Sequence, residues 1–177
     1  MDLREKKTKR SIYNAFLELR SKKPLEKITI KELSEKAEIS KATFYLHYQD
    51  IYELSQQLQL EVLKRIYDSV QDPMDMFVNP SKTFKEIKDA FLANINMINI
   101  LFSGKQEARL PILVENELMK VLVELRPELK DNPVAYTKMS FLIMGAFYSY
   151  LHNTKMFDEQ IVSDTIIDMM EVYSFEK

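Results

Sequence analysis

Apolar residues recur at intervals of three and four positions along most of the chain, which is the spacing of one face of an α-helix. Residues 4–21 show this spacing first, with Ile12, Ala15, Phe16 and Leu19 on one face. The same spacing predicts further helices over residues 51–70, 81–102, 106–125, 133–151 and 159–173. Only 2 Gly are present and no strand-like run is bounded by turn residues, so we expect an all-α protein.

Between the first two long helices, residues 28–50 carry the signals of two short helices. Thr29 and Glu32 match the S/T-x-x-E capping box, which begins a helix at residue 30. Residues 38–40 interrupt this helix, and Ser40 can cap a second one that continues to residue 47 or 48. Two short helices joined by a short turn form the helix-turn-helix layout, whose second helix enters the major groove of DNA.

Residues 37–54, with the sequence AEISKATFYLHYQDIYEL, resemble the DNA-binding signature of the TetR/AcrR family of bacterial transcriptional regulators. In that family the turn usually reads Ala-Gly-Val-Ser, and the recognition helix contains a Thr, an aromatic-Tyr pair and a His-Phe or similar pair. Here the turn is residues 37–40, the Thr is Thr43, and the two pairs are residues 44–45 and 47–48. The resemblance covers about residues 8–55; beyond them it consists of helix count and chain length alone.

Two positions depart from the pattern of that family. Glu38 stands where the family usually has Gly, so a left-handed backbone at this position would carry a steric cost. Ile51 stands where the family usually has a Lys that contacts phosphate. The resemblance therefore does not carry this phosphate contact over to Ile51.

The layout and the resemblance together predict which residues contact DNA. Lys41 can donate hydrogen bonds to guanine. The family's counterparts of Tyr45 and His47 often bond phosphates, which position a protein without reading sequence. Phe44 and Tyr48 we expect in the core of the head instead. The predicted DNA-binding residues are Thr29, Ser40, Lys41, Ala42, Thr43, Tyr45 and His47.

Charge is distributed unevenly along the chain. Residues 1–50 contain 12 Lys and Arg against 8 Asp and Glu, a net charge of +4. The remaining residues contain 13 against 19, a net charge of −6. A basic head on an acidic body suits a nucleic-acid-binding module joined to a part that does not touch DNA.

Residues that would indicate an enzyme are nearly absent. The sequence has no Gly-rich phosphate loop, no H-E-x-x-H motif and no Cys, and His47 and His152 are far apart. We predict no catalytic residue, no metal site and no cofactor. The absence of Cys fits a reducing cytoplasm, where we expect the protein. We expect no signal peptide and no membrane span, because the longest apolar run, residues 141–148, is far shorter than the ~20 residues a span needs.

The second part of the chain is rich in Met and aromatic residues, which fill an ordinary helical core and also suit adaptable binding pockets. The resemblance implies an effector cavity between these helices without naming its lining. The candidate pocket residues are Met97, Met119, Met139, Met144, Phe147 and Tyr148. The last two helices each carry an apolar stripe, and a large exposed stripe usually marks an interface. The candidate dimer-interface residues are Phe141, Gly145, Leu151, Val162, Ile166, Met169 and Tyr173.

These observations favour a two-domain protein: a three-helix DNA-binding head over residues 1–50, and an effector-binding and dimerisation domain over residues 51–177. The function we expect is that of a homodimeric transcriptional repressor, which a small, largely apolar effector releases from a palindromic DNA operator. The alternative is a helical adaptor protein that binds a protein partner and binds DNA weakly or without specificity.

Overall fold

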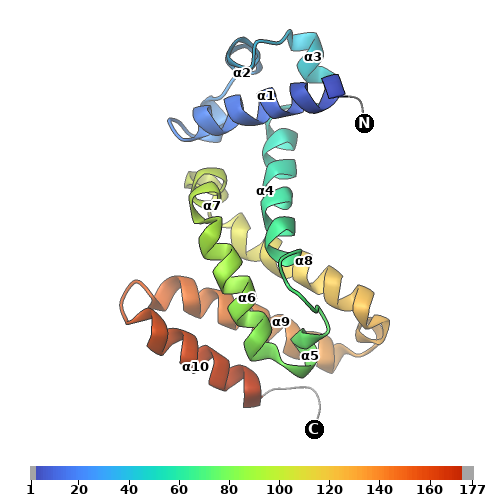
Figure 1. Cartoon of the computed structure of the whole chain (residues 1–177), viewed down its shortest axis with the longest axis vertical. Coiled ribbons are helices and arrows are strands. Elements are labelled where there is room, and N and C mark those ends of the chain that lie inside the picture. The colour runs from blue at the N-terminus through green and yellow to red at the C-terminus, as the bar shows by residue number, and fades with distance from the viewer. Residues whose placement is uncertain (1–2, 173–177) are drawn as a thin grey trace. The chain divides into compact units, whose positions relative to one another are not determined.

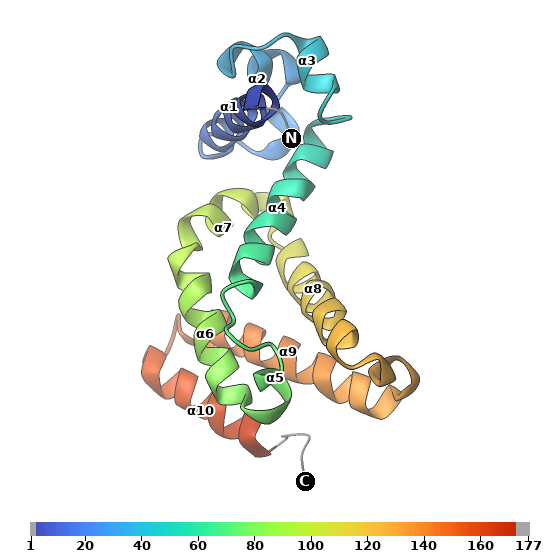
Figure 2. The same ribbon diagram turned by 45° about the vertical axis from the view of Figure 1, so that its right-hand side comes forward.

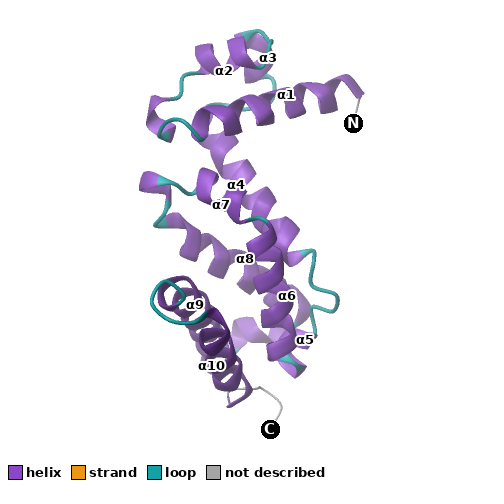
Figure 3. Cartoon of the chain, turned by 60° about the vertical axis from the view of Figure 1, so that its left-hand side comes forward, coloured by secondary structure: helices purple, strands orange, loops and turns teal. Residues whose placement is uncertain are grey.

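The computed structural model describes residues 3–172, and every regular element within them is a helix (Figure 1). Figure 3 shows helices and connecting loops over the same residues, without a strand. The all-α fold predicted from the sequence is therefore confirmed. The α-helices are α1 (Leu3–Arg20), α2 (Ile30–Lys36), α3 (Lys41–Tyr45), α4 (Ile51–Tyr67), α5 (Asp75–Val78), α6 (Pro80–Ala93), α7 (Ile95–Leu101), α8 (Arg109–Leu125), α9 (Pro133–Asn153) and α10 (Glu159–Val172). Three 3₁₀ turns complete the described residues, namely η1 (Leu25–Lys27), η2 (Gly104–Gln106) and η3 (Pro127–Asp131).

The chain forms two compact units. Unit 1 combines the chain up to Val62 with Ile95–Glu107, and unit 2 combines Leu63–Asn94 with the chain from Ala108 onward. This division differs from the expected boundary at residue 50, because the first part of α4 and the segment that contains α7 pack with the N-terminal helices. The functional division into a head and a body stays a prediction.

In unit 1 the apolar faces of the N-terminal helices meet in a small core. Phe16, Leu33 and Phe44 are fully buried, and Leu25 and Ile28 are only 2% and 6% exposed. Phe44 is one of the two residues that the sequence predicted in the core of the head. Burying aromatic and branched side chains of this size removes apolar surface from water and stabilises the packing of these helices.

Buried polar side chains attach the segment after α7 to the rest of unit 1. The guanidinium of Arg20, which is 3% exposed, donates to the Ser103 Oγ at 2.7 Å and to the Lys23 carbonyl at 3.0 Å. The fully buried Gln59 of α4 donates to the Leu101 carbonyl at 3.1 Å. Burial lowers the pKa of Arg20 because desolvation disfavours the charged form, although Glu26 opposes this shift.

In unit 2, α9 packs against both α8 and α10, and α10 also packs against α6. Figure 2 shows α9 and α10 side by side. Tyr150 of α9 and Val162 and Ile166 of α10 are buried together, with Phe84 of α6 packed against them. These three residues of α9 and α10 are thus buried within one protomer.

Several predicted helix boundaries differ from those observed. The helix expected over residues 81–102 is two helices, because the backbone breaks at Asn94, whose side-chain amide donates to the Ala90 carbonyl at 2.8 Å. The loop expected over 73–80 contains the short α5, and α4 ends at Tyr67 rather than near residue 70. Helix α3 ends at Tyr45, two or three residues before the expected end at residue 47 or 48. No helix within residues 3–172 is long and apolar enough to cross a membrane.

Candidate nucleic-acid interface and apolar pocket

Side-chain caps fix the starts of α2 and α3. The Thr29 Oγ1 accepts a hydrogen bond from the Glu32 N–H at 3.2 Å, and the Ser40 Oγ accepts one from the Thr43 N–H at 3.0 Å. Both caps were predicted from the sequence. The reciprocal half of the capping box is not formed, because the Glu32 carboxylate instead pairs with the Lys23 ammonium group.

The turn between α2 and α3 contains the single non-Gly residue with a positive φ within residues 3–172. Glu38 has φ 55°, in the left-handed region that favours Gly. This is the position at which the sequence predicted a steric cost. The turn therefore keeps its left-handed geometry even though it carries a side chain there, and Glu38 is exposed.

Helix α3 buries one side and exposes the other. Phe44 is fully buried and Tyr48 is 7% exposed, as expected for core residues. Tyr45, in contrast, has 55% of its surface exposed. Its ring meets the Phe44 ring edge-on, with the centroids 5.7 Å apart, so the buried ring positions the exposed one.

The remaining candidate DNA-binding residues lie around the exposed side of α3 and at the start of α2. Ser40, Lys41 and Ala42 are exposed, as is Thr29, while Thr43 and His47 are half-buried. The Thr43 hydroxyl lies 2.8 Å from the Ser40 Oγ, and either oxygen can be the donor. Within residues 3–172, Lys41 makes no ion pair, so its ammonium group is available to a partner of opposite charge.

Two other lysines of unit 1, Lys22 and Lys36, are already paired. The Glu18 carboxylate accepts from the Lys22 and Lys36 ammonium groups at 2.8 and 2.7 Å. These hydrogen bonds, with Lys22 the larger contributor, lower the pKa of Glu18 to about 2. Ile51, at the family's Lys position, is only 6% exposed and packs in the core.

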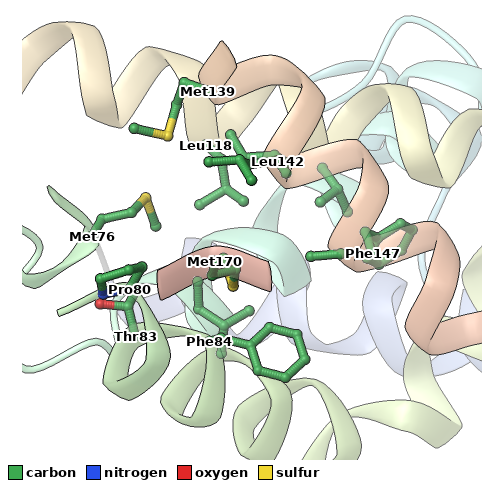
Figure 4. A pocket seen from close by; sticks show the side chains of 13 residues that line it. Met76, Pro80, Thr83, Phe84, Leu118, Met139, Leu142, Phe147 and Met170 are labelled. Carbon is green, nitrogen blue, oxygen red and sulfur yellow. The ribbon is translucent and has the colours of Figure 1, made fainter. Parts of the chain in front are cut away.

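Unit 2 contains an apolar cavity of about 90 Å³, called the main pocket here. Helices α6, α8, α9 and α10 and the residues before α6 supply its walls, as Figure 4 shows in close-up. Its lining residues are apolar apart from one hydroxyl: Met76, Pro80, Thr83, Phe84, Ile87, Val114, Leu118, Met139, Leu142, Ile143, Ala146, Phe147 and Met170.

A second cavity of about 50 Å³ adjoins the main pocket, since Phe84, Ile87, Val114 and Phe147 line both. The second cavity also reaches polar groups that the main pocket lacks. One of them is Tyr150, whose hydroxyl donates to Glu159 Oε1 at 3.0 Å. Burial first, and then this carboxylate, raise the pKa of Tyr150 to about 12.

Two of the six candidate pocket residues line these cavities, namely Met139 and Phe147. Met119 is 4% exposed but lines neither cavity, and Tyr148 is 62% exposed and stacks on His152. Met97 belongs to unit 1, where its sulfur accepts from the Tyr13 hydroxyl at 3.3 Å. Met144 is half-buried and lines neither cavity. A helical spacing of apolar residues predicts which side chains are buried, but it does not predict which of them line a cavity.

Sequence reasoning missed Thr83, which is 2% exposed. Its Oγ1 has no hydrogen-bond partner among the described residues. One signal was available in the sequence. Thr83 stands on the apolar face of α6, three residues after Pro80 and four before Ile87, where a hydroxyl is out of place.

The candidate dimer-interface residues fall into two groups. Phe141, Tyr148 and Met169 are 66%, 62% and 54% exposed. Phe141 and Met169 line a shallow groove between α9 and α10 together with Gly145, where an added Cβ would meet no atom within 4 Å.

The second group lies inside the protomer. Val162 and Ile166 are 7% and 5% exposed and belong to the core of unit 2, against which the half-buried Leu151 packs. Their burial within the protomer leaves them little surface to offer a second copy. Tyr173 lies outside the described residues.

Within residues 3–172, no group of three or more His, Cys, Asp or Glu residues could hold a metal ion. Comparisons with protein-family models, curated proteins and solved structures find no match for this chain. The argument for function therefore depends on the geometry of α3, the main pocket and the exposed face of α9 and α10.

Proposed function

We propose that this protein is a homodimeric, DNA-binding transcriptional repressor of the TetR type, in which α2 and α3 form a helix-turn-helix. The observation that carries the proposal is the division of α3 into two sides. Phe44 is anchored in the core while Lys41 and Tyr45 are exposed next to it. A recognition helix needs this arrangement, because its buried side fixes the angle at which its exposed side enters the groove.

The exposed residues of α3 suit the two kinds of contact that DNA offers. Lys41 makes no ion pair with any residue that the structure describes, and its ammonium group can donate to the O6 and N7 atoms of guanine or to a phosphate. Tyr45 carries a hydroxyl on a ring held by Phe44, and it suits a phosphate oxygen. Most binding energy would come from phosphates, and the specificity would come from Lys41 and its neighbours.

Dimerisation would supply the second recognition helix that a palindromic operator requires. Phe141, Tyr148 and Met169 present exposed apolar side chains on α9 and α10. A two-fold contact would bring the same patch of each protomer together. The open space over Gly145 would let a helix of the second copy approach closely.

The main pocket is the proposed effector site. Pro80, Thr83 and Phe84 place α6 in its wall. The chain continues from α6 into α7, whose Met97 accepts a hydrogen bond from Tyr13 of α1. A ligand that prefers one position of α6 would thereby bias the position of the head, by no more than its difference in affinity for the two states.

DNA titrations at several salt concentrations test the proposal. Tyr45→Ala should weaken binding to all sequences about equally and should flatten the slope of log K against log salt by roughly one unit. Lys41→Ala should cost about 1–3 kcal/mol at one base pair of each half-site if Lys41 reads guanine. Tyr136, which is 41% exposed on α9 of unit 2, provides the matched control, since Tyr136→Ala should leave both quantities unchanged. Equal effects of Tyr45→Ala and Tyr136→Ala would contradict the assignment of α3.

The oligomeric state tests the dimer. Phe141→Glu places a charge on the exposed α9 face and should convert a dimer at micromolar concentration into a folded monomer. Leu46→Glu is the matched control, because Leu46 is 82% exposed and belongs to unit 1, outside α9 and α10. A substitution at Ile166 would be less informative, since that side chain is buried in the protomer. Sedimentation of the wild type as a monomer would refute this part of the proposal.

One observation favours the alternative function of a protein-binding adaptor. Leu46, directly after α3, is 82% exposed, and Tyr45 and Tyr52 nearby in sequence are 55% and 53% exposed. Apolar exposure of this kind suits a protein partner. The salt dependence of binding distinguishes the two functions. The affinity for DNA falls steeply as the salt concentration rises, whereas the affinity for a protein partner bound through apolar contacts does not.

A further inference from the structure

We infer that a molecule in the main pocket weakens dimerisation directly, because the main pocket and the groove between α9 and α10 share one wall. This inference rests on the proposed function, since it states how the proposed effector site would regulate the proposed dimer. The observations behind it are the lining residues of the two spaces and the uncharged character of the groove.

Three side chains form the shared wall. Leu142 and Ala146 of α9 and Met170 of α10 line the main pocket and also line the groove. Figure 4 labels Leu142 and Met170 among the side chains around the pocket. Each of the three residues is half-buried. The wall is therefore a single layer of side chains, with the main pocket on one side and a surface groove of about 160 Å³ on the other.

The groove suits a second copy of this chain. All eight residues that line it are uncharged, and Phe141 and Met169 expose apolar side chains beside it. A two-fold contact brings residues near the axis against their own copies, so a charged residue there would face a like charge. Residues 139–151 of α9 include no Asp, Glu, Lys or Arg, so this stretch can meet itself without that cost.

A molecule in the pocket and a second copy in the groove would compete for space on the two sides of this wall. Leu142 and Met170 can change rotamer, and Met adapts most readily because three of its side-chain bonds rotate. A molecule in the pocket would leave these side chains less room there and turn them toward the groove, whereas a second copy would restrict them from the other side. Each occupant should therefore lower the affinity for the other by the same factor.

Filling the pocket with a side chain tests the inference without a ligand and without DNA. Leu118 of α8 lines the main pocket but neither the second cavity nor the groove. Leu118→Phe should act as a permanent occupant and raise the dissociation constant of the dimer about tenfold in sedimentation equilibrium of the full chain. Met119→Phe is the matched control, because Met119 follows Leu118 on α8, is also buried and lines none of the three spaces. It should leave the dissociation constant unchanged.

A double-mutant cycle identifies the wall residue. Met170→Ala shortens the shared side chain, so adding it to Leu118→Phe should remove most of the tenfold effect. Met169→Ala is the matched control: Met169 lines the groove but not the main pocket, so its effect should simply add to that of Leu118→Phe. If Leu118→Phe does not fold, Val114→Leu enlarges another side chain of the pocket lining and enters the same cycle.

Equal dissociation constants for the wild type and Leu118→Phe would overturn the inference, as would a tighter dimer. Equal weakening by Leu118→Phe and Met119→Phe would overturn it as well, because general destabilisation would then explain the result. Additive effects of Leu118→Phe and Met170→Ala would exclude the shared wall as the route. A wild-type monomer would refute the proposed dimer together with this inference, whereas a wild-type dimer that Leu118→Phe leaves unchanged would refute this inference alone.

Discussion

Replacing Glu38 by Gly should stabilise unit 1, because Glu38 holds a left-handed backbone with φ 55°. An L-residue with a Cβ pays roughly 1–2 kcal/mol in this region, and Gly pays almost none. Gly also makes the unfolded chain more flexible, which lowers the free energy of unfolding by about 0.4–1 kcal/mol. The expected net gain in the free energy of unfolding is about 1 kcal/mol.

Native-state hydrogen exchange measures this gain in the relevant unit of the full chain. The amides of Ala37 and Phe44 donate to the Leu33 and Ser40 carbonyls at 2.8 and 3.1 Å, on either side of the turn. A gain of about 1 kcal/mol should slow their exchange about fivefold wherever exchange requires unit 1 to open. Amides of α9, in unit 2, provide the comparison and should exchange as in the wild type.

Glu38→Ala is the matched control, because it removes the carboxylate but keeps the Cβ that causes the cost. It should leave exchange nearly unchanged. If Glu38→Ala slowed exchange as much as Glu38→Gly, the gain would come from removing charge, and the steric reasoning would be refuted. Exchange that was faster in Glu38→Gly would refute it as well.

Three further predictions concern single side chains. Gly145→Ala should stabilise the isolated protomer by about 0.5–1 kcal/mol, since its Cβ meets open space, yet should weaken the dimer measured by sedimentation if a second helix packs there. Burial and Glu159 raise the pKa of Tyr150 to about 12. The protonated phenol therefore stabilises the fold fully below pH 10, and this contribution is lost as the pH rises from about 10 to 12. Tyr150→Phe should therefore flatten the fall in unfolding free energy across that window in denaturant titrations. Ser103→Ala removes the hydroxyl that accepts from Arg20 at 2.7 Å and should destabilise unit 1 by about 1–3 kcal/mol in the same assay, with no effect meaning that water replaces the hydroxyl.

Local signals in the sequence predicted the starts of helices well. Thr29 and Ser40, the two caps that the sequence predicted, each accept a hydrogen bond from a backbone N–H of the first turn. Asn79 and Asn132 cap α6 and α9 in the same way. The information for a cap lies within three or four neighbouring residues. It can therefore be identified without knowledge of the tertiary structure.

The break at Asn94 could not be predicted in this way. Phe91, Ile98 and Phe102 are all buried and keep a helical spacing across the break. The residues before Asn94 pack in unit 2, however, and those after it pack in unit 1. The spacing of apolar residues indicates which side of a helix is buried. It does not indicate in which of two cores that side is buried.

The candidate site shows the same limit. The alternation of Phe44 and Tyr48 with Lys41 and Tyr45 was sufficient to separate buried from exposed residues on α3. The pocket depends on small differences in how four helices pack. Its one polar lining residue, Thr83, is not an apolar residue, so the search for apolar spacing did not select it.

Selection from a random duplex DNA library by the wild-type protein tests the central claim most directly. The account predicts enrichment of an inverted repeat whose half-sites lie about one helical turn apart or a multiple of it, roughly 34–36 Å per turn. It also predicts that Lys41→Ala, carried through the same selection, loses the preference at one base pair in each half-site. Recovery of no common sequence by the wild type, at a salt concentration at which it still binds DNA, would contradict the claim that α3 reads DNA.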